Sequence, residues 1–186
     1  MKKKQRTDQF KSDEELYFSW WLDELKEEKI VSDWKYEDHD YYLSPKMTTT
    51  TEYGTYKLQE HKYTPDFHIY WSVDRVELCK LKLGILVSFP VGGLSLVDVK
   101  GGYSNNFNDM RFPLNQKWMM EKLGLYVNKV IPIDGFRINS KKQKVLKKCL
   151  FSETFTPKKY LLTPTGKART IHWKVRSIEQ FLEDIR

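Results

Sequence analysis

The sequence has only two cysteines, no long apolar run and, over much of its last third, almost no acidic residues. Cys79 and Cys149 lie far apart and outside any CxxC or Cys/His cluster, which argues against a disulfide framework and against a zinc site. No apolar run approaches the roughly 18 residues of a membrane span, and the N-terminus stays charged where a signal peptide would turn apolar. We therefore expect a soluble, cytoplasmic protein with no membrane partner.

The scarcity of acids is local. From Arg137 to Arg176 the chain has twelve basic residues and a single acid, Glu153, and the whole chain carries a net charge of +7 with a pI of about 9.2. Such an imbalance suits a surface that faces the phosphates of a polyanion. A basic face kept for solubility is an equally weighted alternative, and charge alone does not decide between the two.

The length and composition predict one domain. The chain has 186 residues, 40% of them apolar, which is enough to bury a core. Ser12 followed by Glu15 has the form of a capping box at the start of an amphipathic helix over 12–29. Further helices are predicted over 115–123 and 177–185, and strands over 67–73, 81–89, 94–99 and 125–133. This order predicts an α/β fold with a mixed central β-sheet flanked by helices.

Three further segments have less definite patterns. Residues 31–43 alternate and are rich in aromatics, as in a strand pair or one long bent strand. The polar stretch 47–62 is expected to be a mobile loop or an exposed hairpin. Residues 135–156 are basic, and a helix is one interpretation of them.

Two acids and a lysine carry the candidate chemistry. In the segment Tyr63–Phe67, Asp66 follows a proline at the mouth of an apolar strand. In the segment Leu96–Gly101, Asp98 and Lys100 stand two residues apart on a strand, so their side chains emerge on the same face. If these two strands are neighbours, the three groups converge at one edge of the sheet.

Such a convergence meets the needs of phosphodiester hydrolysis. Two carboxylates and a backbone carbonyl, here that of Val99, can hold one or two Mg²⁺ ions, which prefer oxygen ligands. The metal would polarise the phosphate and lower the pKa of the attacking water. The Lys100 ammonium would orient that water or stabilise the developing charge. Mn²⁺ is the alternative ion.

Pro65-Asp66 and Asp98-Val99-Lys100 match the signature of the PD-(D/E)XK nuclease superfamily. The sequence resembles most the small phage and Holliday-junction-resolving endonucleases. The resemblance implies a restriction-endonuclease-like core over 12–133, followed by a basic C-terminal extension over 134–186. It also implies that a helix glutamate completes the metal site, and Glu15 holds the matching position, with Glu14 as an adjacent competitor. If a phage encodes the chain, its location would be the host cytoplasm.

The sequence departs from the family pattern at two points. Asp66 and Asp98 are 32 residues apart, more than in compact members, so residues 72–95 are expected to form an inserted hairpin or an elaborated strand pair. The acid before x-Lys is Asp98 where many relatives have glutamate, which the signature permits. Neither departure removes a metal ligand.

Other side chains are weaker candidates. Lys117 matches a family helix that often brings a Gln or Lys near the site, although a solvated helix face is the simpler interpretation. Tyr103, beside the glycines, is a candidate for nucleotide contact. His61, His68 and His172 are expected to be surface or packed residues, because this chemistry uses metal-bound water.

The tail over 155–176 carries turn chemistry at Pro164–Gly166 between two apolar and basic arms, which predicts a β-hairpin. Such a hairpin would contact a DNA backbone or groove, complete the sheet, or do both. The candidate DNA-binding residues in the tail are Lys158, Lys159, Lys167, Arg169 and Lys174.

The residues and the resemblance together predict a metal-dependent DNA endonuclease. The expected substrate is branched DNA, such as a Holliday junction or a flap, met in recombination, replication or repair. A homodimer is the expected assembly, because symmetric paired incision requires two active sites. The alternative is a catalytically silent DNA-binding or structural phage protein that retains the nuclease fold.

Overall fold

A four-stranded sheet lies at the centre of the computed structural model, which describes residues 9–89, 92–101, 107–134, 136–138, 140–146 and 148–186. Its strands are β1 (Val31–Tyr36), β6 (Phe67–Trp71), β7 (Leu94–Val99) and β8 (Val127–Val130), adjacent in that order. β6 runs antiparallel to both β1 and β7, and β8 runs parallel to β7. The predicted α/β fold with a mixed central sheet is confirmed.

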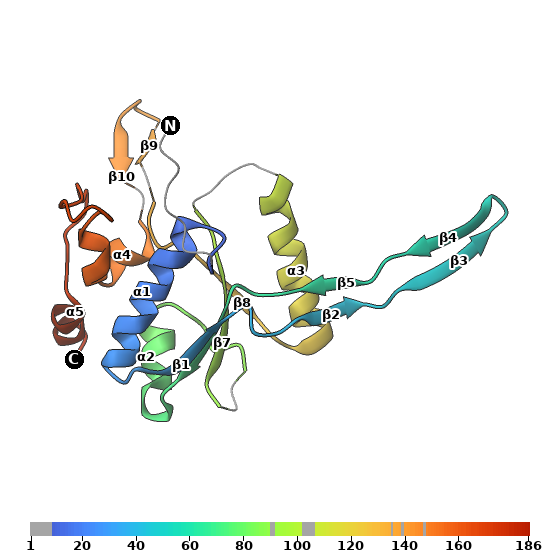
Figure 1. The fold of residues 1–186 in the computed structure, drawn as a ribbon, viewed down its shortest axis with the longest axis horizontal. Coiled ribbons are helices and arrows are strands. Elements are labelled where there is room, and N and C mark those ends of the chain that lie inside the picture. The colour runs from blue at the N-terminus through green and yellow to red at the C-terminus, as the bar shows by residue number, and fades with distance from the viewer. Residues whose placement is uncertain (1–8, 90–91, 102–106, 135, 139, 147) are drawn as a thin grey trace.

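Helices flank this sheet on both faces (Figure 1). On one face, α1 (Asp13–Glu27) buries Phe18, Trp21 and Leu22 in a core that includes Phe67 and Val97 of the sheet. On the other face lies α3 (Phe107–Leu123). It buries Phe112 and Met119 in a second core. This core includes Leu96 of β7 and Val127 of β8.

The start of α1 follows the sequence prediction. The Ser12 hydroxyl accepts a hydrogen bond from the Glu15 amide at 3.2 Å, and the Glu15 carboxylate accepts one from the Ser12 amide at 3.3 Å. This reciprocal capping box satisfies two amides that the helix itself leaves unpaired. By contrast, α3 begins at Phe107, eight residues before the predicted start at Asn115, and it contains Pro113. The predicted start lies on the wrong side of this proline, which the helix accommodates.

Residues 31–63 form strands that pair with partners other than those predicted. β1 pairs with β6, while β2 (Tyr41–Ser44) pairs with β5 (His61–Tyr63), so residues 31–43 form neither one long bent strand nor two strands that pair with each other. Between β2 and β5 the chain forms the hairpin of β3 (Met47–Thr51) and β4 (Gly54–Leu58). Of the two interpretations of 47–62, the exposed hairpin is the one observed.

The strand predicted over 81–89 is wrong, and the described residues of 72–95 form neither the inserted hairpin nor the elaborated strand pair that was expected. After β6 the chain makes the 3₁₀ turn η1 (Val73–Arg75) and the short helix α2 (Val76–Leu81). The following segment contributes one isolated bridge, between Phe89 and Leu94. A side chain replaces the missing ladder: the Asn128 amide accepts from the Leu86 N–H and donates to the Leu86 carbonyl, both at 2.8 Å.

The C-terminal third also departs from expectation. Where a helix was one interpretation of 135–156, the chain forms the hairpin of β9 (Phe136–Ile138) and β10 (Lys144–Leu146), followed by the short α4 (Leu150–Glu153). The predicted hairpin over 155–176 is reduced to the 3₁₀ turn η2 (Lys158–Leu161) and one bridge between Leu162 and Ala168. The predicted last helix is confirmed as α5 (Ile178–Asp184).

Aromatic burial explains why the tail forms no strands. Phe155 stacks on Trp21 of α1 with ring centroids 5.3 Å apart, and Tyr160 meets Tyr17 of α1 edge to face at 4.7 Å. Burying these rings stabilises the fold more than a short exposed ladder would. The tail therefore lies against α1, on the side away from the sheet, and shares its core (Figure 1). Within the described ranges, none of the helices has the length and apolar character needed to cross a bilayer.

Candidate active site

The sheet brings Asp66 and Asp98 together, as the strand pattern predicts. β6 and β7 are antiparallel neighbours with Phe67 opposite Val97, so the preceding Asp66 lies beside the following Asp98. Asp66 Oδ2 accepts a hydrogen bond from the Val99 N–H at 2.7 Å. This bond ties the segment before β6 to the end of β7, and it holds one carboxylate at the sheet edge.

Asp98 is almost completely buried, with 4% of its surface exposed. Its Oδ2 accepts a hydrogen bond from the Tyr63 hydroxyl at 2.5 Å. Its Oδ1 forms an ion pair with the Lys100 ammonium but, within the described part of the chain, has no hydrogen-bond partner of good geometry. The Lys100 amide donates to the Val130 carbonyl at 2.8 Å, which fixes the end of β7 against β8.

The electrostatics of the pair are unusual for carboxylates. Burial, and then the negative charge of Asp98, raise the pKa of Asp66 from its ordinary 3.8 to about 8, while the Lys100 ammonium opposes this rise. Two like charges this close cannot both ionise without a compensating cation. In the metal-free protein Asp66 therefore holds a proton at neutral pH.

The donor set fits a hard divalent cation. The two carboxylates offer buried oxygens, one of them without a hydrogen bond, and Mg²⁺ prefers such ligands. The Val99 carbonyl lies on the same strand end. Among the described residues, no group of three or more His, Cys, Asp or Glu side chains is close enough together to hold a metal. The structure thus brings two candidate acidic ligands together, and the third candidate, predicted on α1, is not grouped with them.

The predicted helix ligand, Glu15, is occupied elsewhere. Its Oε2 accepts hydrogen bonds from the amides of Lys11 at 2.8 Å and Ser12 at 3.3 Å, and from the Tyr36 hydroxyl at 2.7 Å. This carboxylate closes the helix cap. Its neighbour Glu14 instead lies against Gly101, directly after Lys100, where a Cβ on the glycine would be 3.3 Å from Glu14 Oε1. Of the two helix glutamates, Glu14 is the one whose carboxylate lies against the residue that follows Lys100.

Two neighbours of the acid pair were missed in the sequence. Tyr63 lies in the same motif as Asp66 and ends β5, which pairs with β2. Its hydroxyl nevertheless reaches Asp98 on β7, and this contact positions the Asp98 carboxylate. Lys129 stands opposite Asp98 in the parallel register of β7 and β8. The ammonium groups of Lys100 and Lys129 lie 5.8 and 6.0 Å from the centroid of the Phe112 ring. The available signal was a lysine within the mostly apolar run over 125–133.

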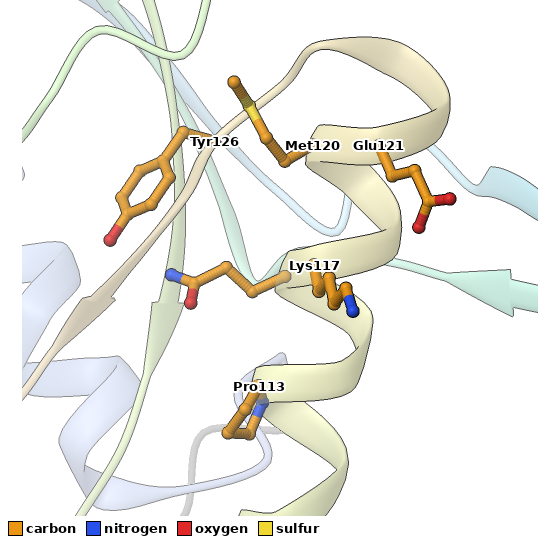
Figure 2. A pocket seen from close by; sticks show the side chains of 6 residues that line it. Pro113, Lys117, Met120, Glu121 and Tyr126 are labelled. Atoms are coloured by element: carbon orange, nitrogen blue, oxygen red, sulfur yellow. The ribbon is translucent and has the colours of Figure 1, made fainter.

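Lys117 lies on α3 and lines a pocket of about 360 Å³. Figure 2 shows this pocket between α3, which contributes Met120, and Tyr126 before β8. The adjacent Gln116 donates its side-chain amide to the Val127 carbonyl at 2.5 Å, so it supports the packing of α3 on β8. Tyr103, the predicted nucleotide contact, lies outside the described residues.

The basic residues of the tail have different surroundings. Lys158 and Lys159 are exposed and form ion pairs with Glu179 at 3.0 Å and Asp23 at 3.6 Å. Surface pairs of this kind are weak and exchange readily for phosphate. Arg169 is half-buried over the rings of Tyr17 and Tyr160, at 5.2 and 4.7 Å from their centroids. The two remaining candidates, Lys167 and Lys174, are exposed.

The three candidate histidines are packed or surface residues, as expected, and the exposed one is His172. His68 has 2% of its surface exposed, and burial lowers its pKa to about 4, so it is neutral at pH 7. Its Nε2 lies 3.2 Å from the Tyr41 hydroxyl. His61 Nε2 lies 2.8 Å from the Asn115 side-chain oxygen. Neither ring has the surroundings of a general base.

Comparison with known proteins adds no family assignment. A scan against family models found no match, and searches of curated proteins and of solved structures found no significant similarity.

Proposed function

We propose that this chain is a metal-dependent endonuclease of the PD-(D/E)XK type, which hydrolyses DNA phosphodiester bonds. The observation that carries the proposal is the pair of Asp66, partly buried, and Asp98, buried, beside Lys100, where the central strand β6 begins and its neighbour β7 ends. A fold gains nothing in stability from two adjacent buried carboxyl groups, since each must be desolvated and they repel when ionised. Such an arrangement is typical of sites that bind a cation.

Each residue has a role in this proposal. Asp66 and Asp98 would hold one or two Mg²⁺ or Mn²⁺ ions together with the Val99 carbonyl, and Glu14, or Glu15 after a rearrangement of the cap, would complete the set. When bound, the metal would polarise the scissile phosphate and activate the attacking water. The Lys100 ammonium, now paired with Asp98, would then face the phosphate and stabilise its developing charge.

The fold supports the same interpretation. The acid-x-Lys-Gly strand is β7, the second acid precedes the neighbouring β6, and the N-terminal turn of α1 lies close to Gly101 at the end of β7. These are the relations that the resemblance to small phage and junction-resolving endonucleases implies. Lys129 adds a second cation beside the acid pair, in a place suited to a substrate phosphate.

One observation favours the rival function, a catalytically silent DNA-binding or structural protein. The described residues bring two acids together and not three. In a silent protein the Lys100–Asp98 ion pair and the proton on Asp66 would simply neutralise a relic of the site. The two functions differ in one measurable property, which is cleavage that depends on metal.

Cleavage of a panel of DNA substrates tests the proposal. The panel contains linear duplex, single strand, flap and four-way junction, each with Mg²⁺, Mn²⁺ or chelator. We expect cleavage with either metal, none in chelator, and none by Asp98→Asn. Branched DNA should be preferred, because several backbones can then contact both the site and the exposed lysines of the tail. Binding without cleavage under every condition would favour the silent protein.

A further inference from the structure

The hairpin of β3 and β4 projects from the body of the molecule as an arm (Figure 1). Every residue of both strands is exposed. Among the described residues, the hydrogen bonds of these strands stay within the hairpin, as between the Thr50 and Thr55 hydroxyls. A two-stranded hairpin of this kind is marginally stable alone in water, and a third strand or a packing partner is normally required.

The arm has two unlike faces. Directly opposed residues of an antiparallel pair share a face, and side chains alternate along each strand. One face therefore carries Met47 with Leu58 and Thr49 with Tyr56, while the other carries polar side chains. The three large apolar side chains are about half exposed, at 51% for Met47, 51% for Leu58 and 48% for Tyr56. This is an amphipathic ribbon whose apolar face has nothing of its own subunit to cover it.

The outer edge of β3 lacks the features that keep edges apart. Natural edge strands are protected by charged residues, proline or bulges. Met47–Thr51 contains no charged residue and no proline, and its pairing with β4 runs without a register shift. The whole arm over 47–58 carries one acid, Glu52, and one base, Lys57, so its net charge is zero in a chain of net charge +7.

We propose that the arm binds the arm of a second copy of this chain. The two β3 strands would pair antiparallel about a two-fold axis, which makes a four-stranded sheet with a continuous apolar face. Charge decides between this partner and DNA. Two copies of a basic chain repel each other least at a neutral element, whereas a ribbon that enters a DNA groove would carry an excess of positive charge. This inference does not depend on the proposed nuclease function.

Sedimentation of the full chain and of matched variants tests the pairing. We expect the wild type to dimerise, and Tyr56→Lys on the apolar face to weaken the dimer at least about tenfold. The adjacent Thr55→Lys, on the polar face of the same strand, is the control and should leave the dimer intact. Replacing 47–58 by a two-residue turn should give a monomer that still unfolds cooperatively on heating, because among the described residues the hydrogen bonds of the arm stay within the hairpin.

Disulfide trapping identifies the edge. Single cysteines placed in turn at Thr48, Thr49, Thr50 and Thr51 should give a cross-linked dimer at one or more positions, while a cysteine at Lys57 in β4 should give none. A wild type that stays monomeric up to about 100 µM, a range that covers specific protein affinities, would overturn the proposal. So would a dimer that persists without the arm, or an arm deletion that changes DNA binding and not the state of assembly.

Discussion

The substitution Asp98→Asn tests whether the buried carboxyl pair is a metal site. Repulsion by Asp98 is the second cause, after burial, of the rise in the pKa of Asp66 from 3.8 to about 8. A shift of this size corresponds to roughly 6 kcal/mol, since each pKa unit is worth about 1.4 kcal/mol. Asparagine removes the repulsion by Asp98, so the variant should stabilise the metal-free fold where Asp66 is ionised, and each pKa unit removed from the shift is worth about 1.4 kcal/mol, or about 3–6 °C in Tm.

The pH dependence follows from the same groups. Because the pKa of Asp66 is higher in the folded chain than its ordinary value of 3.8, the folded protein holds an extra proton between about pH 4 and pH 8. The contribution of this group to metal-free stability is therefore largest below about pH 4 and is lost as the pH rises through 8. Metal must displace the proton, so Mg²⁺ affinity should rise with pH across this window and then level off. In Asp98→Asn the pKa of Asp66 should be lower, so the upper limit of this pH range should fall.

Thermal melting near pH 9, in chelator and in Mg²⁺, measures both effects. Mg²⁺ should raise the Tm of the wild type and leave that of Asp98→Asn nearly unchanged, and the variant should melt above the wild type in chelator. Asp74→Asn is the matched control, since the Asp74 side chain is 75% exposed in a surface ion pair. If the wild type melts identically in chelator and in Mg²⁺, and Asp98→Asn melts lower in both, the acid pair is no metal site.

Three further predictions follow from the geometry. Lys100→Ala should retain Mg²⁺ binding, seen by calorimetry, but cleave about 10²-fold more slowly or worse, and near wild-type turnover would remove this lysine from the mechanism. Glu14→Gln should reduce both the affinity for Mg²⁺ and the rate of cleavage. Glu15→Gln should mainly lower the free energy of unfolding, by about 1 kcal/mol, through loss of the helix cap. The reverse result would restore Glu15 as the ligand. The four exposed lysines of the tail are Lys158, Lys159, Lys167 and Lys174. Replacing them with alanine should reduce the slope of the log–log salt dependence of DNA binding by up to about four units. An unchanged slope would show that the tail serves the fold alone.

The sequence by itself determined the elements whose signals are local. Ser12 and Glu15 predict the capping box of α1, β6 is the apolar run that directly follows Asp66, and β7 is the apolar run that contains Asp98. The alternation of side chains along a strand is sufficient to place Asp98 and Lys100 on one face. These features depend on residues within a few positions of each other, so the local pattern contains all the information they need.

Only the tertiary structure decided what depends on distant partners. The strand expected over 81–89 is absent because the Asn128 side chain, from β8, takes the hydrogen bonds of Leu86 that a strand would supply. The tail expected as a hairpin lies against α1 because its aromatic rings are buried there. Likewise the capping box and Tyr36 hold the Glu15 carboxylate, while the Glu14 carboxylate lies against Gly101. In each case a long-range contact outweighs a local preference, and no local pattern records which contact will form.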